Sequence, residues 1–480
     1  MWFEWNVLNK GSSKLKQMKK ILILVIWLIS VLVSIAWTYE NPEKIKNLKN
    51  ILKYDLSVGK IFKKFNSKNI NDELISEDQI KSTEIDTAYN DIRLDYFTVP
   101  VYSSYGGIAQ INNKIIYLSG DGELFLLQKN DNKQFNFKKI SAPIIDNKKN
   151  IFVNNNEKKV GNYAERFFGI KDILVDNFNN FENKLLFASS LIYNELNDCY
   201  TVGIYMTEID NKDIFGVSEW KNIFSTKKCL TINLTSNPKF AAASAGGRII
   251  KLDEKHILLS IGDFYADGVN GPALSQDLSN MYGKMIKINF KNSNYETFSF
   301  GHRNPQGLFI DKDNNIFSTE HGPTYGDELN YISQNNNYGW PLATYGTGYK
   351  SADAYAKKKV SENKKAWPLD ITENTHNFFT KPLFSWGNTI GISNLIVYEN
   401  DHFSKWNKNL IISTLASNQL IRMNFDYKKK SIIYKENIKI GKRIRDIIAL
   451  DDGRIVLLTD RGKKLDENPE ILILSNKNNQ

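Results

Sequence analysis

The chain has 480 residues, of which 41% are hydrophobic and 24% are charged. This composition supplies enough apolar material for a large core and excludes disordered, collagen-like and polytopic membrane proteins. The 63 basic residues outnumber the 53 acidic ones and give a net charge of +10. Because the basic residues are spread along the chain instead of gathering on one predicted element, we interpret them as a solvated surface and expect no nucleic-acid partner.

The N-terminal region carries the clearest local signal. Residues Ile21–Trp37 form a run without a charged side chain and follow a lysine-rich flank, residues 1–20. This pattern predicts a single signal-anchor helix in the cytoplasmic (inner) membrane, with the flank in the cytoplasm and the rest of the chain in the periplasm or outside the cell. A cleaved signal peptide is the alternative, because Ser34-Ile35-Ala36 provides the small residues of a cleavage site.

The residue pattern changes after the N-terminal region. Residues 38–86 are rich in Lys, Asn and Asp, which predicts a stalk. Residues 87–476 contain short runs of β-branched, Leu and aromatic residues between Asn, Asp and Gly turns, without a convincing amphipathic helix. Examples are residues 115–118, 185–188, 257–261, 395–398, 455–459 and 471–474. So many short strands predict an all-β fold and favour a β-propeller over a sandwich.

Two cysteines, Cys199 and Cys229, are the only ones in the chain. In an exported protein they are expected to form a structural disulfide, with two buried free thiols as the alternative. A metal-binding pair would require closer spacing or added histidine ligands.

Four polar motifs lie between residues 301 and 341. They are GHRNPQG (301–307), TEHGP (319–323), GDELN (326–330) and NYGWP (337–341). Each motif alone is typical of a turn. In this order they resemble the pyrroloquinoline quinone (PQQ) dependent aldose dehydrogenases, the glucose and sorbosone dehydrogenase family. The resemblance extends over roughly residues 160 to 475, is weak over 90–160, and implies a six-bladed propeller with PQQ and calcium at its top.

The resemblance also implies a set of cofactor-binding residues. Arg303, Asn304, Gln306, Arg443 and Arg445 match residues that bind PQQ in the family. PQQ is a flat tricarboxylate, and the planar fork of arginine suits carboxylates. The period-two alternation of a strand places Arg443 and Arg445 on one face, where the alternative to cofactor binding is a solvated outer face.

Calcium ligands follow from the same resemblance. The backbone oxygens of Gly322 and Pro323 match the ligands of the calcium that polarises the quinone carbonyl. Glu328 and the backbone of Tyr338 correspond to a second, structural calcium site in relatives.

The chain departs from the family at the catalytic base. The family's histidine, which takes the sugar hydroxyl proton, is replaced by Ser244, and a serine cannot act as a base unaided. Asp263 matches the carboxylate that orients the missing histidine. The candidate bases are therefore His321, Glu320 and Asp263, with a structural role as the alternative for His321.

Two functions are compatible with these features. The first is a membrane-tethered, exported quinoprotein dehydrogenase that oxidises the anomeric hydroxyl of an aldose sugar to a lactone and passes electrons to a respiratory acceptor. The second is a catalytically weakened propeller that acts as an exported ligand-binding module, which Ser244 favours. The retained arginines and the Gly-Pro turn indicate that the pocket still holds PQQ, and we favour the enzyme.

Overall fold

The computed structural model describes most of the chain after residue 79. The described residues are 73–75, 80–101, 104–129, 135–161, 163–176, 178, 183–210, 214, 216–268, 270–346, 378–461 and 468–477. The chain divides into two units, Met1–Ile70 and Asn71–Gln480. The predicted anchor Ile21–Trp37 and most of the predicted stalk lie outside the described residues. Within the described part, none of the helices has the length and apolar character needed to cross a membrane.

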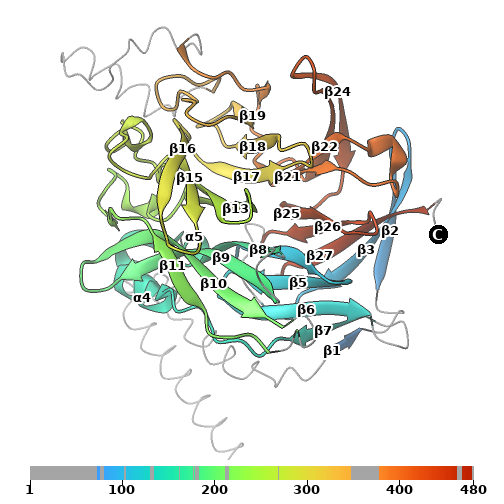
Figure 1. The fold of residues 1–480 in the computed structure, drawn as a ribbon, viewed down its shortest axis with the longest axis horizontal. Helices are drawn as coiled ribbons and strands as arrows, with labels where there is room; N and C mark the ends of the chain where they lie inside the picture. Colours follow the sequence, from blue (N-terminus) through green and yellow to red (C-terminus); the bar gives the residue numbers. More distant parts are fainter. Residues whose placement is uncertain are drawn as a thin grey trace, which may run out of the picture. The chain divides into compact units, whose positions relative to one another are not determined.

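The second unit is a six-bladed β-propeller, which confirms the predicted fold class (Figure 1). Blade 1 contains β4 (Gly106–Ile111), β5 (Lys114–Ser119), β6 (Leu124–Lys129) and β7 (Phe135–Lys139), with β1 (Glu73–Ile75) at its edge. Blade 2 contains β8 (Ile170–Asp176), β9 (Lys184–Asn194), β10 (Cys199–Ile209) and β11 (Lys221–Ser225), with β12 (Leu230–Thr231) paired to β10. Blade 3 contains β13 (Gly246–Lys251), β14 (His256–Ile261), β15 (Lys284–Asn289) and β16 (Tyr295–Phe300).

The remaining three blades complete the ring. Blade 4 contains β17 (Pro305–Ile310), β18 (Ile316–Glu320), β19 (Asp327–Ile332) and β20 (Phe384–Trp386). Blade 5 contains β21 (Ile392–Tyr398), β22 (Asn409–Thr414), β23 (Gln419–Asp426) and β24 (Ser431–Lys439). Blade 6 contains β25 (Ile444–Ala449), β26 (Ile455–Thr459), β27 (Glu470–Asn476), β3 (Asp91–Thr98) and β2 (Lys81–Asp86). The innermost strands β4, β8, β13, β17, β21 and β25 neighbour one another around the centre.

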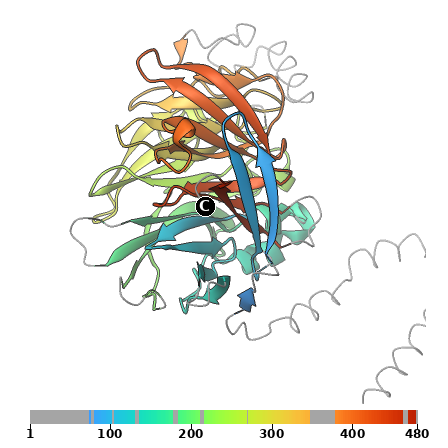
Figure 2. The ribbon, with the colours of Figure 1, turned by 90° about the vertical axis from the view of Figure 1, so that its right-hand side faces the viewer.

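Blade 6 joins the two ends of the propeller. The N-terminal strand β3 pairs with the C-terminal strand β27, with Leu94 opposite Leu474 and Phe97 opposite Ile471. Figure 2 shows these blue and red strands side by side. The sheet also includes β2, so it begins six residues before residue 87, where the sequence analysis placed the start of the propeller.

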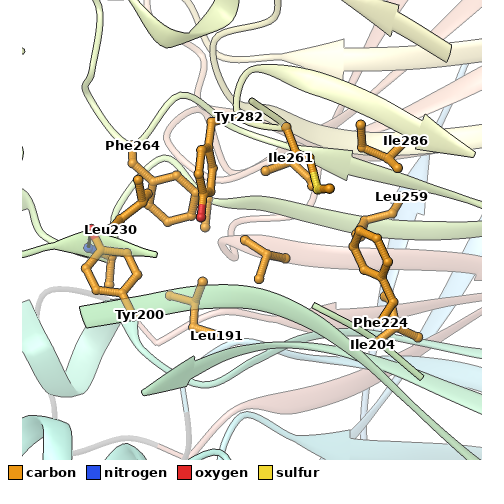
Figure 3. Close-up of a cluster of buried hydrophobic side chains, with 14 of the residues drawn as sticks. Leu191, Tyr200, Ile204, Phe224, Leu230, Leu259, Ile261, Phe264, Tyr282 and Ile286 are labelled. Atoms are coloured by element: carbon orange, nitrogen blue, oxygen red, sulfur yellow. Dashed lines mark hydrogen bonds between the residues drawn. The ribbon is translucent and has the colours of Figure 1, made fainter. Parts of the chain in front are cut away.

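Burial explains the apolar runs in the sequence. All six residues of β22 are buried, because this strand lies inside its sheet and both faces are covered by neighbouring blades. The outermost strand β24 is largely exposed and correspondingly polar. Figure 3 shows the packing between blades 2 and 3, where Tyr200 lies near Phe264 and Ile204 lies near Leu259.

Two helices that the sequence did not predict lie between blades 1 and 2, and the longer one is not amphipathic. They are α4 (Lys149–Val160) and α5 (Tyr163–Phe167). Helix α4 is mostly polar and buries only a few residues, including Phe152, whose ring stacks on Phe168 with centroids 4.3 Å apart. Such a helix is stabilised by tertiary packing of one aromatic side chain, so it leaves little periodicity in the sequence.

The predicted disulfide between Cys199 and Cys229 is confirmed. The two Cα atoms lie 5.6 Å apart. Cys199 begins β10 and Cys229 directly precedes β12, which pairs with the start of β10. The bond therefore secures the outer part of blade 2.

Candidate functional site

A buried arginine connects the innermost strands at the centre of the ring. The guanidinium Nη1 of Arg248 lies 2.9 Å from a carboxylate oxygen of Asp172 and 2.9 Å from one of Asp446. Its Nε donates to the backbone oxygen of Gln306 at 2.8 Å, and its Nη2 donates to that of Arg445 at 2.7 Å. Arg248 thus fixes the backbone at two positions that the sequence predicts to bind a cofactor.

The same network reaches the two remaining innermost strands. Asp446 accepts hydrogen bonds from the backbone nitrogen of Ile108 at 3.0 Å and from the amide of Asn394 at 2.7 Å. Asp172 also accepts one from the backbone nitrogen of Ile249. Burial raises the pKa of Asp172 to about 7, against the opposing charge of Arg248. All six blades are therefore linked through one ion cluster with two carboxylates and one guanidinium.

A cavity of about 240 Å³ lies where the innermost strands begin. Every predicted PQQ-binding residue lines it, together with Ser244, His321, Gly322 and Pro323. The arginines and amides come from the turn before β17 and the start of β25, and Ser244 comes from the segment before β13. The ring thus brings together residues that are far apart in the sequence.

Arg443 and Arg445 share a carboxylate partner. Their guanidinium groups lie 3.5 and 2.7 Å from Oδ2 of Asp460, and Arg445 also donates to the side-chain oxygen of Gln306 at 3.0 Å. Burial raises the pKa of Asp460, but the charges of the two arginines outweigh this effect and hold the pKa below its ordinary value. Both side chains line the cavity, and among the described residues the buried Nε atoms of both have no hydrogen-bond acceptor. One carboxylate is therefore shared between two cations that retain unused donors.

Arg303 is held between two aromatic rings. Its guanidinium carbon lies 5.4 Å from the ring centroids of both Tyr265 and Trp340. Its Nη1 donates to the backbone oxygen of His321 at 3.1 Å, and its backbone nitrogen donates to Glu320. Glu320 is therefore occupied in holding the backbone of the arginine.

His321 and the two predicted amides form a chain of hydrogen bonds. Nε2 of His321 lies 2.6 Å from the backbone oxygen of Ile392, and Nδ1 lies 3.2 Å from the amide nitrogen of Asn304. The Asn304 oxygen accepts from the Gln306 amide at 2.9 Å. Burial lowers the pKa of His321 despite the opposing charge of Asp327. A neutral ring protonated at Nε2 satisfies both contacts, so this arrangement favours a role for His321 in orienting Asn304 over a role as proton acceptor.

Ser244 and Asp263 occupy different surroundings. Ser244 lines the cavity in a left-handed conformation, with φ of 53°, and its carbonyl oxygen packs so closely against Gly262 that an added Cβ there would lie 1.9 Å away. Asp263 does not line the cavity, and its Oδ1 accepts from the backbone nitrogen of Tyr265 at 2.9 Å. Burial raises the pKa of Asp263 to about 7, with Arg303 opposing.

The residues predicted to bind calcium fall into two groups. Gly322 and Pro323 line the cavity, and the Gly322 nitrogen donates to Asp327 at 3.1 Å. Glu328 and Tyr338 do not line it. Burial and the charge of Glu320 raise the pKa of Glu328 to about 8. In the described part of the chain, no group of three or more His, Cys, Asp or Glu side chains could hold a metal ion. Both calcium assignments stay predictions, the first on the backbone oxygens of Gly322 and Pro323 and the second on Glu328 and the Tyr338 backbone.

One wall of the cavity was not predicted from the sequence. Tyr105, Arg166, Phe167 and Lys171 line it, from the start of β4, helix α5 and the start of β8. The ammonium of Lys171 lies 3.8 Å and the guanidinium carbon of Arg445 4.4 Å from the Tyr105 ring centroid. The sequence offered one signal for this wall: a lysine near the start of an apolar strand. Burial of such a side chain is costly unless it has polar partners or faces a polar cavity.

The charge of the cavity wall is strongly positive. The acidic residue of the lining is Asp327, and the basic residues are Arg166, Lys171, Arg303, Arg443 and Arg445. This donor set suits a planar ligand with several carboxylates. The cavity is therefore chemically compatible with PQQ.

Comparisons with known proteins place these features among sugar dehydrogenases. The family model for glucose/sorbosone dehydrogenase matches residues 169–467. An aldose sugar dehydrogenase of Escherichia coli K12 is 29% identical over 247 residues, which cover 48% of this chain and 60% of that protein. The chain thus matches less than two thirds of the length of this curated relative.

Two solved structures share the fold. The soluble aldose sugar dehydrogenase from Escherichia coli in its apo form superposes with a TM-score of 0.59 at 19% identity, covering 80% of this chain and 100% of that one. The PQQ-bound aldose sugar dehydrogenase from Streptomyces coelicolor has a TM-score of 0.50 at 15% identity, covering 80% and 98%. At this identity the likeness shows the propeller fold.

Proposed function

The chain belongs to the glucose/sorbosone dehydrogenase family, and from this premise we propose that it is a PQQ-dependent oxidoreductase that oxidises the anomeric hydroxyl of an aldose to its lactone. The observation that carries the proposal is the convergence of Arg303, Arg443 and Arg445 with Asn304 and Gln306 on one cavity. PQQ bound in a structural relative supports the choice of cofactor.

The residues of the cavity have distinct parts in this proposal. When bound, PQQ supplies an orthoquinone that accepts two electrons. Arg443 and Arg445 hold its carboxylates with planar donors, and their unused Nε–H groups strengthen the case for an anionic ligand. His321 holds the amide of Asn304 by a hydrogen bond, and this amide would contact the polar edge of the cofactor. The backbone oxygens of Gly322 and Pro323 hold a calcium ion.

The proposal includes export and a membrane anchor. The charge-free run Ile21–Trp37 supports a single N-terminal span in the inner membrane, with the propeller in the periplasm or outside the cell. The disulfide Cys199–Cys229 supports an oxidising compartment. An enzyme in this position passes electrons to a respiratory acceptor.

The second proposed calcium site, at Glu328 and the Tyr338 backbone, has a structural role.

An exported ligand-binding module is the second candidate function, and Ser244 at the position of the family's base favours it. The two candidates are separated by loading the full chain with PQQ and CaCl₂ and following dye reduction across a panel of aldoses. Lactone formation with dye reduction supports the enzyme. PQQ binding without turnover supports the binding module, and failure to bind PQQ contradicts both.

A further inference from the structure

Lys171 is a buried cavity residue that none of the predicted roles uses. It is the second residue of the innermost strand β8, only 4% exposed, and it lines the cavity together with Ser244. Its side chain packs against Gly247, where an added Cβ would lie 2.4 Å from the Lys171 Cβ. Gly247 has φ of 107°, and its missing side chain leaves the space that Lys171 fills. Lys171 therefore lies beside the strand that leads away from Ser244.

Among the described residues, the Lys171 amino group has one hydrogen-bond acceptor and one aromatic neighbour. Nζ donates one hydrogen bond to the backbone oxygen of Phe167 and lies 3.8 Å from the centroid of the Tyr105 ring. Within the described part of the chain, no carboxylate forms an ion pair with it. A neutral amine has two N–H groups and one lone pair. The hydrogen bond to Phe167 uses one of these N–H groups, so the lone pair of a neutral Lys171 remains for a ligand in the cavity.

The charges around Lys171 favour the same state. Burial lowers its pKa well below the ordinary value, and Arg445 and Lys149 add to the effect, whereas Asp460 opposes it. Asp460 is already paired with Arg445 at 2.7 Å, which limits its effect on the lysine. The Tyr105 hydroxyl stays neutral because burial raises its pKa. A lysine in this state can accept a proton, as a general base must.

We propose that Lys171 is the proton acceptor of the reaction, in place of the histidine that Ser244 replaces. This inference rests on the proposed function. As the anomeric O–H bond of the aldose breaks, its proton passes to Nζ of Lys171. The hydrogen on the same carbon leaves with its electron pair to the orthoquinone, and the C=O bond of the lactone forms. The sugar loses two electrons and the quinone gains them.

Three versions of the full chain test the proposal: wild type, Lys171→Met and Lys171→Arg. Both variants are expected to lose about 10²-fold or more in kcat while they still bind PQQ, because neither side chain accepts a proton at neutral pH. Lys171→Arg carries a fixed positive charge and cannot accept a proton, so activity retained in this variant would show an electrostatic role and overturn the proposal. Lys139→Met is the matched control, because this lysine lies on the surface of blade 1, paired with Glu123, and its activity should equal that of wild type.

A second readout does not depend on turnover. In protein labelled with ¹³C at lysine Cε, the signal that disappears in Lys171→Arg belongs to Lys171, and its titration without PQQ should occur well below the ordinary lysine range. Titration in the ordinary lysine range would contradict the proposal. Absence of turnover in PQQ-loaded wild type would overturn the proposed function as well, whereas full turnover in Lys171→Met would overturn only the role of Lys171.

Discussion

The indole nitrogen of Trp340 donates a hydrogen bond of 2.7 Å to Oδ2 of Asp263. The resemblance predicts that Asp263 corresponds to the carboxylate that orients the family's catalytic histidine and that Ser244 stands in place of that histidine. With its other oxygen bound to the Tyr265 backbone, Asp263 holds the two residues whose rings flank Arg303. The carboxylate thus has a structural use without the histidine, because it positions the aromatic rings around Arg303, which lines the cavity.

The raised pKa of Asp263 predicts a pH-dependent cost to stability. Its folded-state pKa of about 7 lies above the unfolded value near 4, so the unfolded protein binds fewer protons between these values and the free energy of unfolding falls as pH rises. Asp263→Asn should remove this contribution. Urea unfolding should be measured from pH 4.5 to 7.5. The free energy of unfolding of the variant, minus that of wild type, should increase by about 1 kcal/mol per pH unit. A difference that stays constant with pH would refute the assignment.

Removal of Arg248 should strongly destabilise the propeller. Arg248→Met leaves Asp172 and Asp446 buried without their cation, which is expected to cost about 3–5 kcal/mol in free energy of unfolding. Chemical denaturation measures this cost. Arg93→Met, which removes an exposed partner of Asp95, is the control and should change stability by less than about 1 kcal/mol. Equal effects of the two substitutions would contradict the central role of the cluster.

Loss of the disulfide should lower the melting temperature. Cys199 and Cys229 are 30 residues apart in the sequence, and closing a loop of this size typically contributes about 2–4 kcal/mol. The double variant Cys199→Ser/Cys229→Ser should melt earlier than wild type. Thiol titration of the denatured, unreduced exported protein should find no free thiol, and two titratable thiols would rule the bond out in the cell.

A histidine at position 244 should compensate for the loss of Lys171. Ser244 lines the cavity and its left-handed backbone tolerates histidine. In the Lys171→Met background, Ser244→His is expected to restore turnover, since a general base is typically worth about 10²–10⁴-fold. The pH profile of kcat should then follow the imidazole. If the PQQ-loaded double variant turns over as slowly as PQQ-loaded Lys171→Met, a histidine at position 244 cannot act as a base on the substrate.

The sequence predicted the parts of the site that depend on short motifs. The turn containing Arg303 and Asn304, and the alternation of Arg443 and Arg445, are local patterns, and all four side chains line the cavity. Their alternative, a solvated outer face for Arg443 and Arg445, requires side chains that point away from the centre, and these two do not.

Contacts between distant segments could not be predicted in the same way. Tyr105 meets Arg445 only because the ring closes between blades 6 and 1. Lys171 lies at the cavity because β8 is the innermost strand of its blade, which no local pattern indicates. Helix α4 depends on the burial of Phe152, and a polar helix of this kind has no clear periodicity.

Binding of PQQ to the full chain tests the account most directly, because both the enzyme and the role of Lys171 depend on it. Titration calorimetry with PQQ and CaCl₂ should show one saturable site. Arg303→Ala, Arg443→Ala and Arg445→Ala should each weaken binding by about 1.5–3 kcal/mol, Arg→Lys should recover only part, and Arg454→Ala, on the surface beside Asp452, should change nothing. Affinity that is absent in wild type, or unaltered in all three cavity variants, would contradict the account.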